Sequence, residues 1–199
     1  DGKEIICTVN GTLDSYDPRD SRLAGVHNIE NMMAAVAGAA SVGCRGEAVG
    51  RAIRQFVPHG HRLQHVLTTE SGVSFYDDSK ATNVSSARVA LESMTRPTVL
   101  LLGGRHKNEP YTSLLPAIGA HCRQVLAYGE ATEAIMRDLD GLVPVEPVAG
   151  GFDEVVRRAR AFAAPGDAVL LAPACSSYDM FANYEERGKT FAALARGEA

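Results

Sequence analysis

From about residue 61 onward, the chain alternates between short apolar runs and segments in which apolar residues recur every three to four positions. The continuous runs predict buried strands at 73–76, 98–102, 124–128, 143–145 and 168–171. The periodic segments predict amphipathic helices over 84–94, 114–118, 132–139, 152–162 and 180–194. Because the strands lack polar alternation, we expect a mostly parallel sheet with helices on both faces, which is a doubly wound α/β domain.

The first 60 residues have a different pattern. An apolar run predicts a strand at 5–9, and Asn10-Gly11 after it is typical of a tight turn. A polar connection rich in Asp and Arg is expected to follow, through Arg22. Two helices are then predicted, over 28–40 and 47–56.

Pro58-His59-Gly60 interrupts the helical pattern, and we therefore place a domain boundary there. A chain of 199 residues is long enough for one large domain or two small ones. We expect a first domain over 1–59 and a second over 60–199.

Composition excludes several classes of protein. With 45% hydrophobic and 22% charged residues, the chain is typical of a soluble globular protein. Its net charge of −4 provides no overall basic field, so we expect no nucleic-acid partner. The longest uncharged stretch, 31–44, is too short to span a bilayer, so no membrane partner is expected. The four cysteines form no CxxC pair, which favours reduced thiols in a cytoplasmic protein.

Three predicted loops carry candidate chemistry, because ligands of doubly wound sheets bind at the carboxyl ends of the strands. The first loop is Asp77-Asp78-Ser79-Lys80-Ala81-Thr82-Asn83. Thr82 or Asn83 can cap the helix that follows. Free N–H groups at that helix start, beside Lys80 and two hydroxyls, would bind an anion, and a carboxylate could accept hydrogen bonds from ribose hydroxyls. The alternative is an ordinary polar loop.

The second loop, Gly103-Gly104-Arg105-His106-Lys107, offers backbone approach to a ligand and a lysine charge for a carboxylate or phosphate, although it is not a GxGxxG motif. A plain glycine turn is the alternative. The third loop follows the last strand, and its Ser176 and Ser177 could donate to a bound carboxylate. A Cys175 nucleophile is disfavoured because no histidine partner can be placed. The other alternative is a helix start capped by Ser177 or Asp179.

Two further patterns do not support a site. His59, His61 and His65 share no helix face and have no cysteine pair beside them, so a hinge is favoured over zinc. Arg62 between them is a better candidate, as a bidentate phosphate ligand. Gly188-Lys189-Thr190 lacks the first glycine of a Walker A motif and falls within a predicted helix, so we find no P-loop in these 199 residues.

Taken together, these residues resemble the Mur ligase family, over nearly the whole chain and in order. The motifs are Gly25-Val26-His27-Asn28-Ile29-Glu30-Asn31, His61-Arg62-Leu63, Asp78-Ser79-Lys80-Ala81-Thr82-Asn83, Leu102-Gly103-Gly104 with Lys107, Pro173-Ala174-Cys175 with Ser177, and Asn183-Tyr184-Glu185 with Arg187-Gly188. The run from Asp78 to Asn83 is typical of the members that add D-glutamate to UDP-N-acetylmuramoyl-L-alanine.

The resemblance implies a three-domain, cytoplasmic, monomeric enzyme of peptidoglycan synthesis. Residues 1–59 would be the tail of its central P-loop ATPase domain, and 60–199 its C-terminal Rossmann-like domain. The P-loop, the magnesium-binding acids and the UDP pocket would lie upstream of Asp1, so the chain would be a fragment without ligase activity of its own. In the family reaction, ATP phosphorylates a carboxylate and the amine of D-glutamate attacks the acyl phosphate.

The resemblance also assigns roles on the nucleotide side. Asn28 and Asn31 would face the adenine of ATP. Arg62 would reach the phosphates from the hinge. Asp78 would contact the ribose, and Lys80 would lie close to the nucleotide and the acyl phosphate, so that Lys80 and Arg62 are the catalytic candidates.

On the amino-acid side, the resemblance implies that the D-glutamate carboxylates are held by Thr82, Lys107, Ser177 and Tyr178, with Tyr184 packed nearby. Such an assignment suits a dianionic substrate, which needs a cation and hydroxyl donors in a mostly dry pocket. Tyr178 and Tyr184 depart from the usual apolar or Phe side chains of the family.

Further departures are Arg105-His106, where the family often has Asp or another small polar residue, and Ala172, where serine is frequent. Two other readings stay open. One is a ligase similar to folylpolyglutamate synthases, which the run from Asp78 to Asn83 disfavours. The other is a non-catalytic domain that binds a nucleotide or an acidic metabolite.

Overall fold

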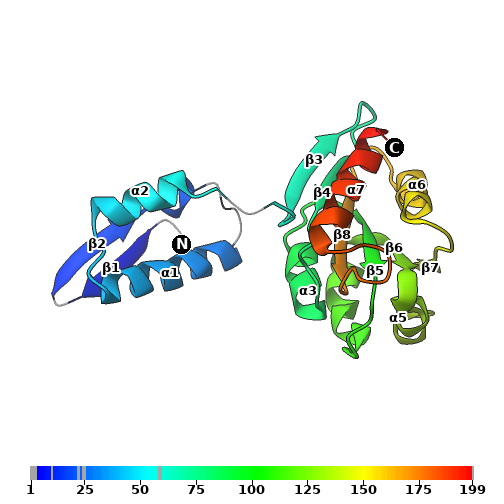
Figure 1. The fold of residues 1–199 in the computed structure, drawn as a ribbon, viewed down its shortest axis with the longest axis horizontal. Helices are drawn as coiled ribbons and strands as arrows, with labels where there is room; N and C mark the ends of the chain where they lie inside the picture. The colour runs from blue at the N-terminus through cyan, green and yellow to red at the C-terminus, as the bar shows by residue number, and fades with distance from the viewer. Residues whose placement is uncertain (1–3, 10, 22, 24–25, 58–59, 199) are drawn as a thin grey trace. The chain divides into compact units, whose positions relative to one another are not determined.

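The computed structural model of the chain describes residues 4–9, 11–21, 23, 26–57 and 60–198, without the side chains of Val26 and His27. The chain divides into two compact units, 1–59 and 60–199 (Figure 1). The turn predicted at Asn10, the residues Pro58-His59 of the predicted boundary and Gly25 of the first motif lie outside the described residues.

The N-terminal unit consists of a hairpin and two helices. Strands β1 (Ile5–Val9) and β2 (Thr12–Tyr16) pair antiparallel and are followed by a short 3-10 helix, η1 (Pro18–Asp20). Helices α1 (Val26–Ser41) and α2 (Glu47–Gln55) confirm the two predicted helices. The core of the unit is formed by Ile5, Tyr16, Met32, Val36 and Val49.

The prediction of an irregular connection after residue 11 was wrong, because β2 and η1 lie there. Only Tyr16 among the five residues of β2 is buried, so the strand carries almost no hydrophobic signal. Its pairing with β1 along all five positions holds it in place instead.

The C-terminal unit is built on a six-stranded sheet with the order β3-β4-β8-β5-β6-β7. The strands are β3 (Gln64–Thr68), β4 (Ser74–Asp77), β5 (Thr98–Gly103), β6 (Cys122–Tyr128), β7 (Val145–Pro147) and β8 (Ala168–Ala174). All neighbours pair parallel except the edge strand β3, which is antiparallel to β4. The predicted mostly parallel α/β sheet is therefore confirmed.

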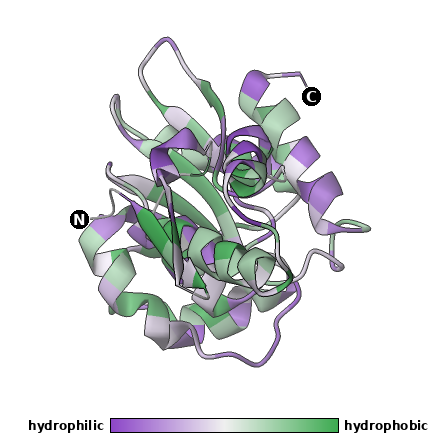
Figure 2. Ribbon diagram, turned by 90° about the vertical axis from the view of Figure 1, so that its left-hand side faces the viewer, coloured by the Kyte–Doolittle hydropathy of each residue, from purple (hydrophilic) through white to green (hydrophobic). Residues whose placement is uncertain are grey.

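Helices cover both faces of this sheet (Figure 1). One face packs against α3 (Val84–Glu92), η2 (Tyr111–Leu114), α4 (Leu115–His121), η3 (Gly129–Ala131) and α5 (Thr132–Leu139). The opposite face packs against α6 (Phe152–Phe162) and α7 (Tyr184–Arg196). The helices alternate hydrophobic and hydrophilic residues along their length, as two-sided packing between sheet and solvent requires (Figure 2).

Several predicted boundaries differ from the structure. β3 was not predicted, because its residues are exposed or half-buried. β7 lies two residues later than predicted and β8 extends three residues further. The final helix begins at Tyr184 rather than 180, since Met180 and Phe181 pack onto the core from the preceding loop. Its cap is Asn183, whose side chain accepts from the Glu186 N–H at 2.8 Å, and not Ser177 or Asp179.

All four cysteines are among the described residues and are free thiols. Burial raises the pKa of Cys122 to about 12, so its thiol stays protonated near neutral pH. Within the described ranges, no helix combines the length and the apolar character needed to cross a bilayer.

Candidate functional site

The three candidate loops lie at one edge of the sheet. They follow β4, β8 and β5, which are adjacent and parallel, so their carboxyl ends meet at the same edge. Hydrogen bonds join the loops directly. The Asp78 N–H donates to the Leu171 carbonyl at 2.8 Å, and the Ala174 N–H donates to the Ala81 carbonyl at 2.9 Å. The sequence-based expectation of one shared edge is thus met by the backbone.

A buried arginine fastens two of these loops to α7. Arg187 is fully buried, and its guanidinium donates to the Ser79 hydroxyl at 2.9 Å and to the Ser79 carbonyl at 2.8 Å. It also donates to the Cys175 carbonyl at 3.2 Å from two of its nitrogens. The Ser79 hydroxyl in turn donates to the Tyr184 carbonyl at 2.7 Å. Arg187 therefore fixes the β4 loop, the β8 loop and the start of α7 against one another.

A second buried contact joins the beginning of the unit to the end of β4. His61 Nδ1 lies 2.6 Å from Asp77 Oδ2, and the other carboxylate oxygen of Asp77 accepts from the Ser79 N–H at 2.8 Å. The His61 carbonyl accepts from the Lys80 N–H at 3.1 Å. His61 has a φ of +63°, an uncommon backbone conformation that these contacts hold in place.

Asp78 lies in a cluster of charged and aromatic groups with Arg62, Lys80 and Tyr184. Burial raises the pKa of the Asp78 carboxyl to about 6, although a hydrogen bond from the Leu63 N–H and the charge of Arg62 oppose this. The hydrogen bond with Glu185 raises the pKa of the Tyr184 hydroxyl, and the charge of Arg62 opposes this rise. Lys80 Nζ lies 5.4 Å from the centre of the Tyr184 ring, within cation–π range.

The raised pKa of Asp78 makes stability depend on pH. Since its pKa of about 6 in the folded chain exceeds the ordinary value of 3.8, the carboxyl stabilises the fold below about pH 4 and loses that contribution as the pH rises through 6. The free energy of unfolding of the wild type, relative to Asp78→Asn, should therefore fall by about 2–3 kcal/mol between about pH 4 and pH 7. Urea unfolding at several pH values measures this difference, and a constant difference would contradict the assignment.

The β5 loop needs its two glycines for packing within the protein. A Cβ on Gly103 would overlap the Tyr128 carbonyl, and one on Gly104 would overlap the Ser176 carbonyl. Both residues have positive φ, +156° and +127°. The glycines thus let the β5 loop pass close to the ends of its neighbouring strands. From the sequence, the two glycines had been expected to let the backbone approach a ligand, with a plain glycine turn as the alternative.

The β8 loop begins with strained backbone. Ala174 has a φ of +57°, in the left-handed region that residues with a side chain rarely adopt. Its N–H bond to the Ala81 carbonyl, at 2.9 Å, accompanies this conformation. Backbone of this kind costs energy and is concentrated at functional sites. The strained turn into Cys175–Ser177 therefore supports this loop as part of the candidate site.

The start of α3 is not the open anion site predicted from the sequence. The Asn83 side chain accepts from the Ser86 N–H at 2.8 Å, which confirms Asn83 rather than Thr82 as the cap. Glu109 Oε2 accepts from the Val84 N–H at 3.1 Å. The protein therefore already satisfies two of the N–H groups that a ligand would have used.

The structure also argues against a Cys175 nucleophile. Cys175 is fully buried, and burial raises the pKa of its thiol to about 11. Its Sγ lies 3.0 Å from the Tyr111 hydroxyl, and that hydroxyl lies 3.0 Å from His106 Nδ1. His106 therefore contacts the Tyr111 hydroxyl and not the Cys175 thiol.

The four residues predicted to hold the amino acid follow the three adjacent strands. Thr82 follows β4, Lys107 follows β5, and Ser177 follows β8. Burial raises the pKa of the Cys175 thiol, two residues before Ser177, and the charge of Lys107 is near enough to oppose this slightly. Ser177 is buried, whereas Tyr178 is 62% exposed. Their roles in binding stay predictions.

Asn28 and Asn31 lie on α1, in the other unit. Asn31 Nδ2 donates to Asn28 Oδ1 at 3.5 Å, so the two amides are neighbours on one helix face. Their expected role toward adenine stays a prediction.

Sequence reasoning gave too little weight to three of these residues. His61 was treated as an incidental hinge histidine, and His65 Nε2 meets the Thr68 hydroxyl at 3.0 Å. Arg187 belonged to one of the family motifs but had no role assigned, and Glu109 lay outside every motif. A signal for Arg187 exists, because the apolar face of α7 includes its position and a charged residue there must find buried partners.

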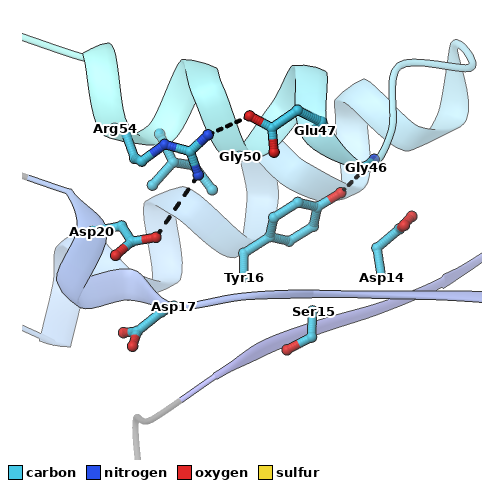
Figure 3. A pocket seen from close by; sticks show the side chains of 10 residues that line it. Asp14, Ser15, Tyr16, Asp17, Asp20, Gly46, Glu47, Gly50 and Arg54 are labelled. Atoms are coloured by element: carbon cyan, nitrogen blue, oxygen red, sulfur yellow. Dashed lines mark hydrogen bonds and ion pairs between the residues drawn. The ribbon is translucent and has the colours of Figure 1, made fainter.

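Two pockets are formed by described residues of the N-terminal unit. One, of about 240 Å³, is lined by acidic residues (Figure 3). Arg54 lies between Glu47 and Asp20, and the Tyr16 hydroxyl accepts from the Gly46 N–H at 3.0 Å, so these polar groups satisfy one another. The other pocket, of about 450 Å³, is apolar and lies between α1 and α2.

Comparison with known proteins identifies the family. The family described as Mur ligase, glutamate ligase domain, matches residues 61–175, more than half of the chain. The chain belongs to the Mur ligase family. A curated UDP-N-acetylmuramoylalanine--D-glutamate ligase of Acidobacterium capsulatum is 48% identical over 169 residues, which cover 85% of the chain and 36% of the relative.

A second Mur ligase with the same curated name, from Salinibacter ruber, is 41% identical over 195 residues, 98% of the chain and 42% of the relative. The chain thus spans about two fifths of the length of these relatives. Among solved structures, a pseudomurein peptide ligase type C of Methanothermus fervidus is similar in fold, with a TM-score of 0.69 at 12% identity over 100% of the chain and 39% of that protein.

Proposed function

We propose that this chain is the part of an ATP-dependent Mur ligase that binds D-glutamate and joins it to UDP-N-acetylmuramoyl-L-alanine in the cytoplasmic synthesis of peptidoglycan precursors. The observation that carries the proposal is the meeting of the β4, β8 and β5 loops at one sheet edge, with a lysine and hydroxyl side chains on them. The names of the most similar curated relatives support the same amino acid.

In this proposal, Lys107 meets a carboxylate of D-glutamate. The Lys107 side chain is exposed and has no ion pair or hydrogen bond within the part of the chain that the structure describes. Thr82 and Ser177 supply hydroxyl donors from the loops that follow β4 and β8, with Tyr178 and Tyr184 at the border of the pocket. A cation with neutral donors suits a dianionic ligand, because a buried carboxylate needs charge-assisted hydrogen bonds.

The residues around Asp78 are proposed to meet the nucleotide. Arg62 and Lys80 are cations suited to phosphate oxygens, and Asp78 accepts hydrogen bonds of the kind that ribose hydroxyls donate. Asn28 and Asn31 are proposed to face the adenine. Among the described residues, no three acidic, histidine or cysteine side chains converge on a metal site.

A folylpolyglutamate synthase-like function is the second candidate. A folylpolyglutamate synthase of Mycobacterium tuberculosis has a TM-score of 0.65 over 89% of the chain and 42% of that protein, at 16% identity. At that identity the likeness concerns the fold alone. The curated relatives above 40% identity favour D-glutamate addition to the UDP-sugar.

The test is an amino-acid panel with the enzyme made from the complete reading frame that encodes this chain. Formation of ADP and phosphate should require D-glutamate together with UDP-N-acetylmuramoyl-L-alanine. L-Glutamate, D-aspartate and a folate acceptor should give no turnover. Turnover with a folate acceptor, or with another amino acid in place of D-glutamate, would overturn the proposal.

Lys107→Ala tests the pocket itself. Loss of a carboxylate partner should raise the KM for D-glutamate by about 10- to 100-fold, the range of a charge-assisted hydrogen bond, and leave the KM for ATP unchanged. An unchanged KM for D-glutamate would remove Lys107 from the proposed site.

A further inference from the structure

The Lys107 loop is fastened to the rest of the unit on both sides of the lysine. On the N-terminal side, Arg105 and Ser176 form an isolated antiparallel bridge, with the Arg105 N–H donating to the Ser176 carbonyl at 2.8 Å. The Ser176 hydroxyl donates back to the Arg105 carbonyl at 3.4 Å. The Arg105 guanidinium also pairs with Glu130 at 3.1 Å. This side of the loop is therefore tied to the β8 loop.

On the C-terminal side, the loop is tied to α3. Glu109 Oε2 accepts from the Val84 N–H, the first N–H of that helix, at 3.1 Å. Asn108 between Lys107 and Glu109 has a φ of +60°, the left-handed conformation that asparagine tolerates better than most residues. The turn at Asn108 directs Glu109 back to α3, while Lys107 is exposed to solvent.

The contact between Glu109 and the Val84 N–H also determines which group the Glu109 carboxylate charge faces. A glutamate two residues from a lysine could neutralise it, but no ion pair joins them in the described residues, and Glu109 is occupied at the positive end of α3. Among the described residues, Lys107 is therefore left without an acidic partner, and its charge is available for a ligand. His106, on the other side of Lys107, meets the Tyr111 hydroxyl at 3.0 Å and so adds a further attachment.

We propose that Glu109 is a positioning residue of the amino-acid pocket: by binding the N-terminus of α3, it holds Lys107 at the sheet edge beside the Thr82 and Ser177 loops and keeps the lysine unpaired. The inference rests on the proposed function, because it assigns to Lys107 the carboxylate of the amino-acid substrate. It explains why an acidic residue stands beside a pocket for a dianion, since its charge is used on the helix.

The test compares Glu109→Ala and Glu109→Gln in the enzyme made from the complete reading frame. Glu109→Ala should raise the KM for D-glutamate by about 5- to 20-fold with kcat changed less than about 2-fold, because it disorders a binding group and no reacting group. Glu109→Gln keeps an oxygen acceptor for the Val84 N–H, so its KM should lie within about 3-fold of the wild type. The KM for ATP should not change in either variant.

Glu133→Ala is the matched control. Glu133 lies in the first turn of α5, is exposed and has no hydrogen bond or ion pair among the described residues, so its removal changes the net charge equally and should leave every KM unchanged. Thermal unfolding of all variants separates loss of fold from loss of the loop position. Equal KM effects in the Ala and Gln variants, or a loss in kcat alone, would overturn the proposal.

The result also separates the inference from the proposed function. If Lys107→Ala raises the KM for D-glutamate and Glu109→Ala does not, the positioning role of Glu109 is wrong and the pocket stands. If neither variant changes that KM, the amino-acid pocket itself is wrongly placed.

Discussion

Arg187→Ala should destabilise the C-terminal unit by about 3–5 kcal/mol, because it removes a large buried side chain and several buried hydrogen bonds at once. The substitution leaves a cavity where the guanidinium lay, and it leaves the Ser79 and Cys175 carbonyls without their donors. The β4 and β8 loops would also lose their common attachment to α7, so binding at the sheet edge should weaken along with stability.

Urea unfolding followed by circular dichroism measures the loss, and since the chain has no tryptophan, hydrogen exchange of the loop amides serves as the local probe. Arg196→Ala is the control on the same helix. Its side chain is 45% exposed and lies 4.0 Å from Glu198, so its loss should cost less than about 0.5 kcal/mol. Equal unfolding midpoints for Arg187→Ala and the wild type would contradict the structural role of Arg187.

Gly104→Ala should have the second largest effect, a destabilisation of about 2–4 kcal/mol. The new methyl group would overlap a backbone carbonyl, that of Ser176, at a φ of +127° that side-chain-bearing residues rarely adopt. Relief requires the β5 and β8 loops to separate, which would break the bridge between Arg105 and Ser176. D-Glutamate affinity should fall with stability.

Gly119→Ala is the control for this substitution. Gly119 lies in α4 and has open space around the position of a Cβ. Gly119→Ala should therefore stabilise the protein by about 0.5–1 kcal/mol, because alanine favours the helix. Thermal unfolding of the two variants should move in opposite directions. A Gly104→Ala protein as stable as the wild type would mean that the two loops can separate freely.

The sheet of the C-terminal unit could be predicted from the sequence because its strands are buried on both faces. β5, for example, is buried at all six positions, so its apolar run has no other explanation. β3 and β2 escaped prediction for the opposite reason, since edge strands with one solvent face resemble loops in hydrophobicity. The start of α7 was misplaced because loop residues such as Phe181 also pack on the core.

The position of the candidate site could be predicted from the sequence, but the contacts that hold its loops together could not. Strand order places three loops at one edge, and a predicted α/β pattern is enough for that. The sequence could not show that Glu109 closes the start of α3 or that Arg187 joins two loops, because these contacts depend on residues far apart in the chain. The N–H groups at a helix start that appears free in the sequence can be bound by a carboxylate from another loop, as Glu109 binds the Val84 N–H.

The bond between Arg187 and Ser79 has a consequence for how the unit folds. The two residues are 108 positions apart, and the helix that carries the arginine follows every strand of the sheet. Contacts with such long chain separation are entropically costly to form early. The sheet can therefore assemble before the β4 and β8 loops are fixed, and these loops take their final positions last, when α7 docks.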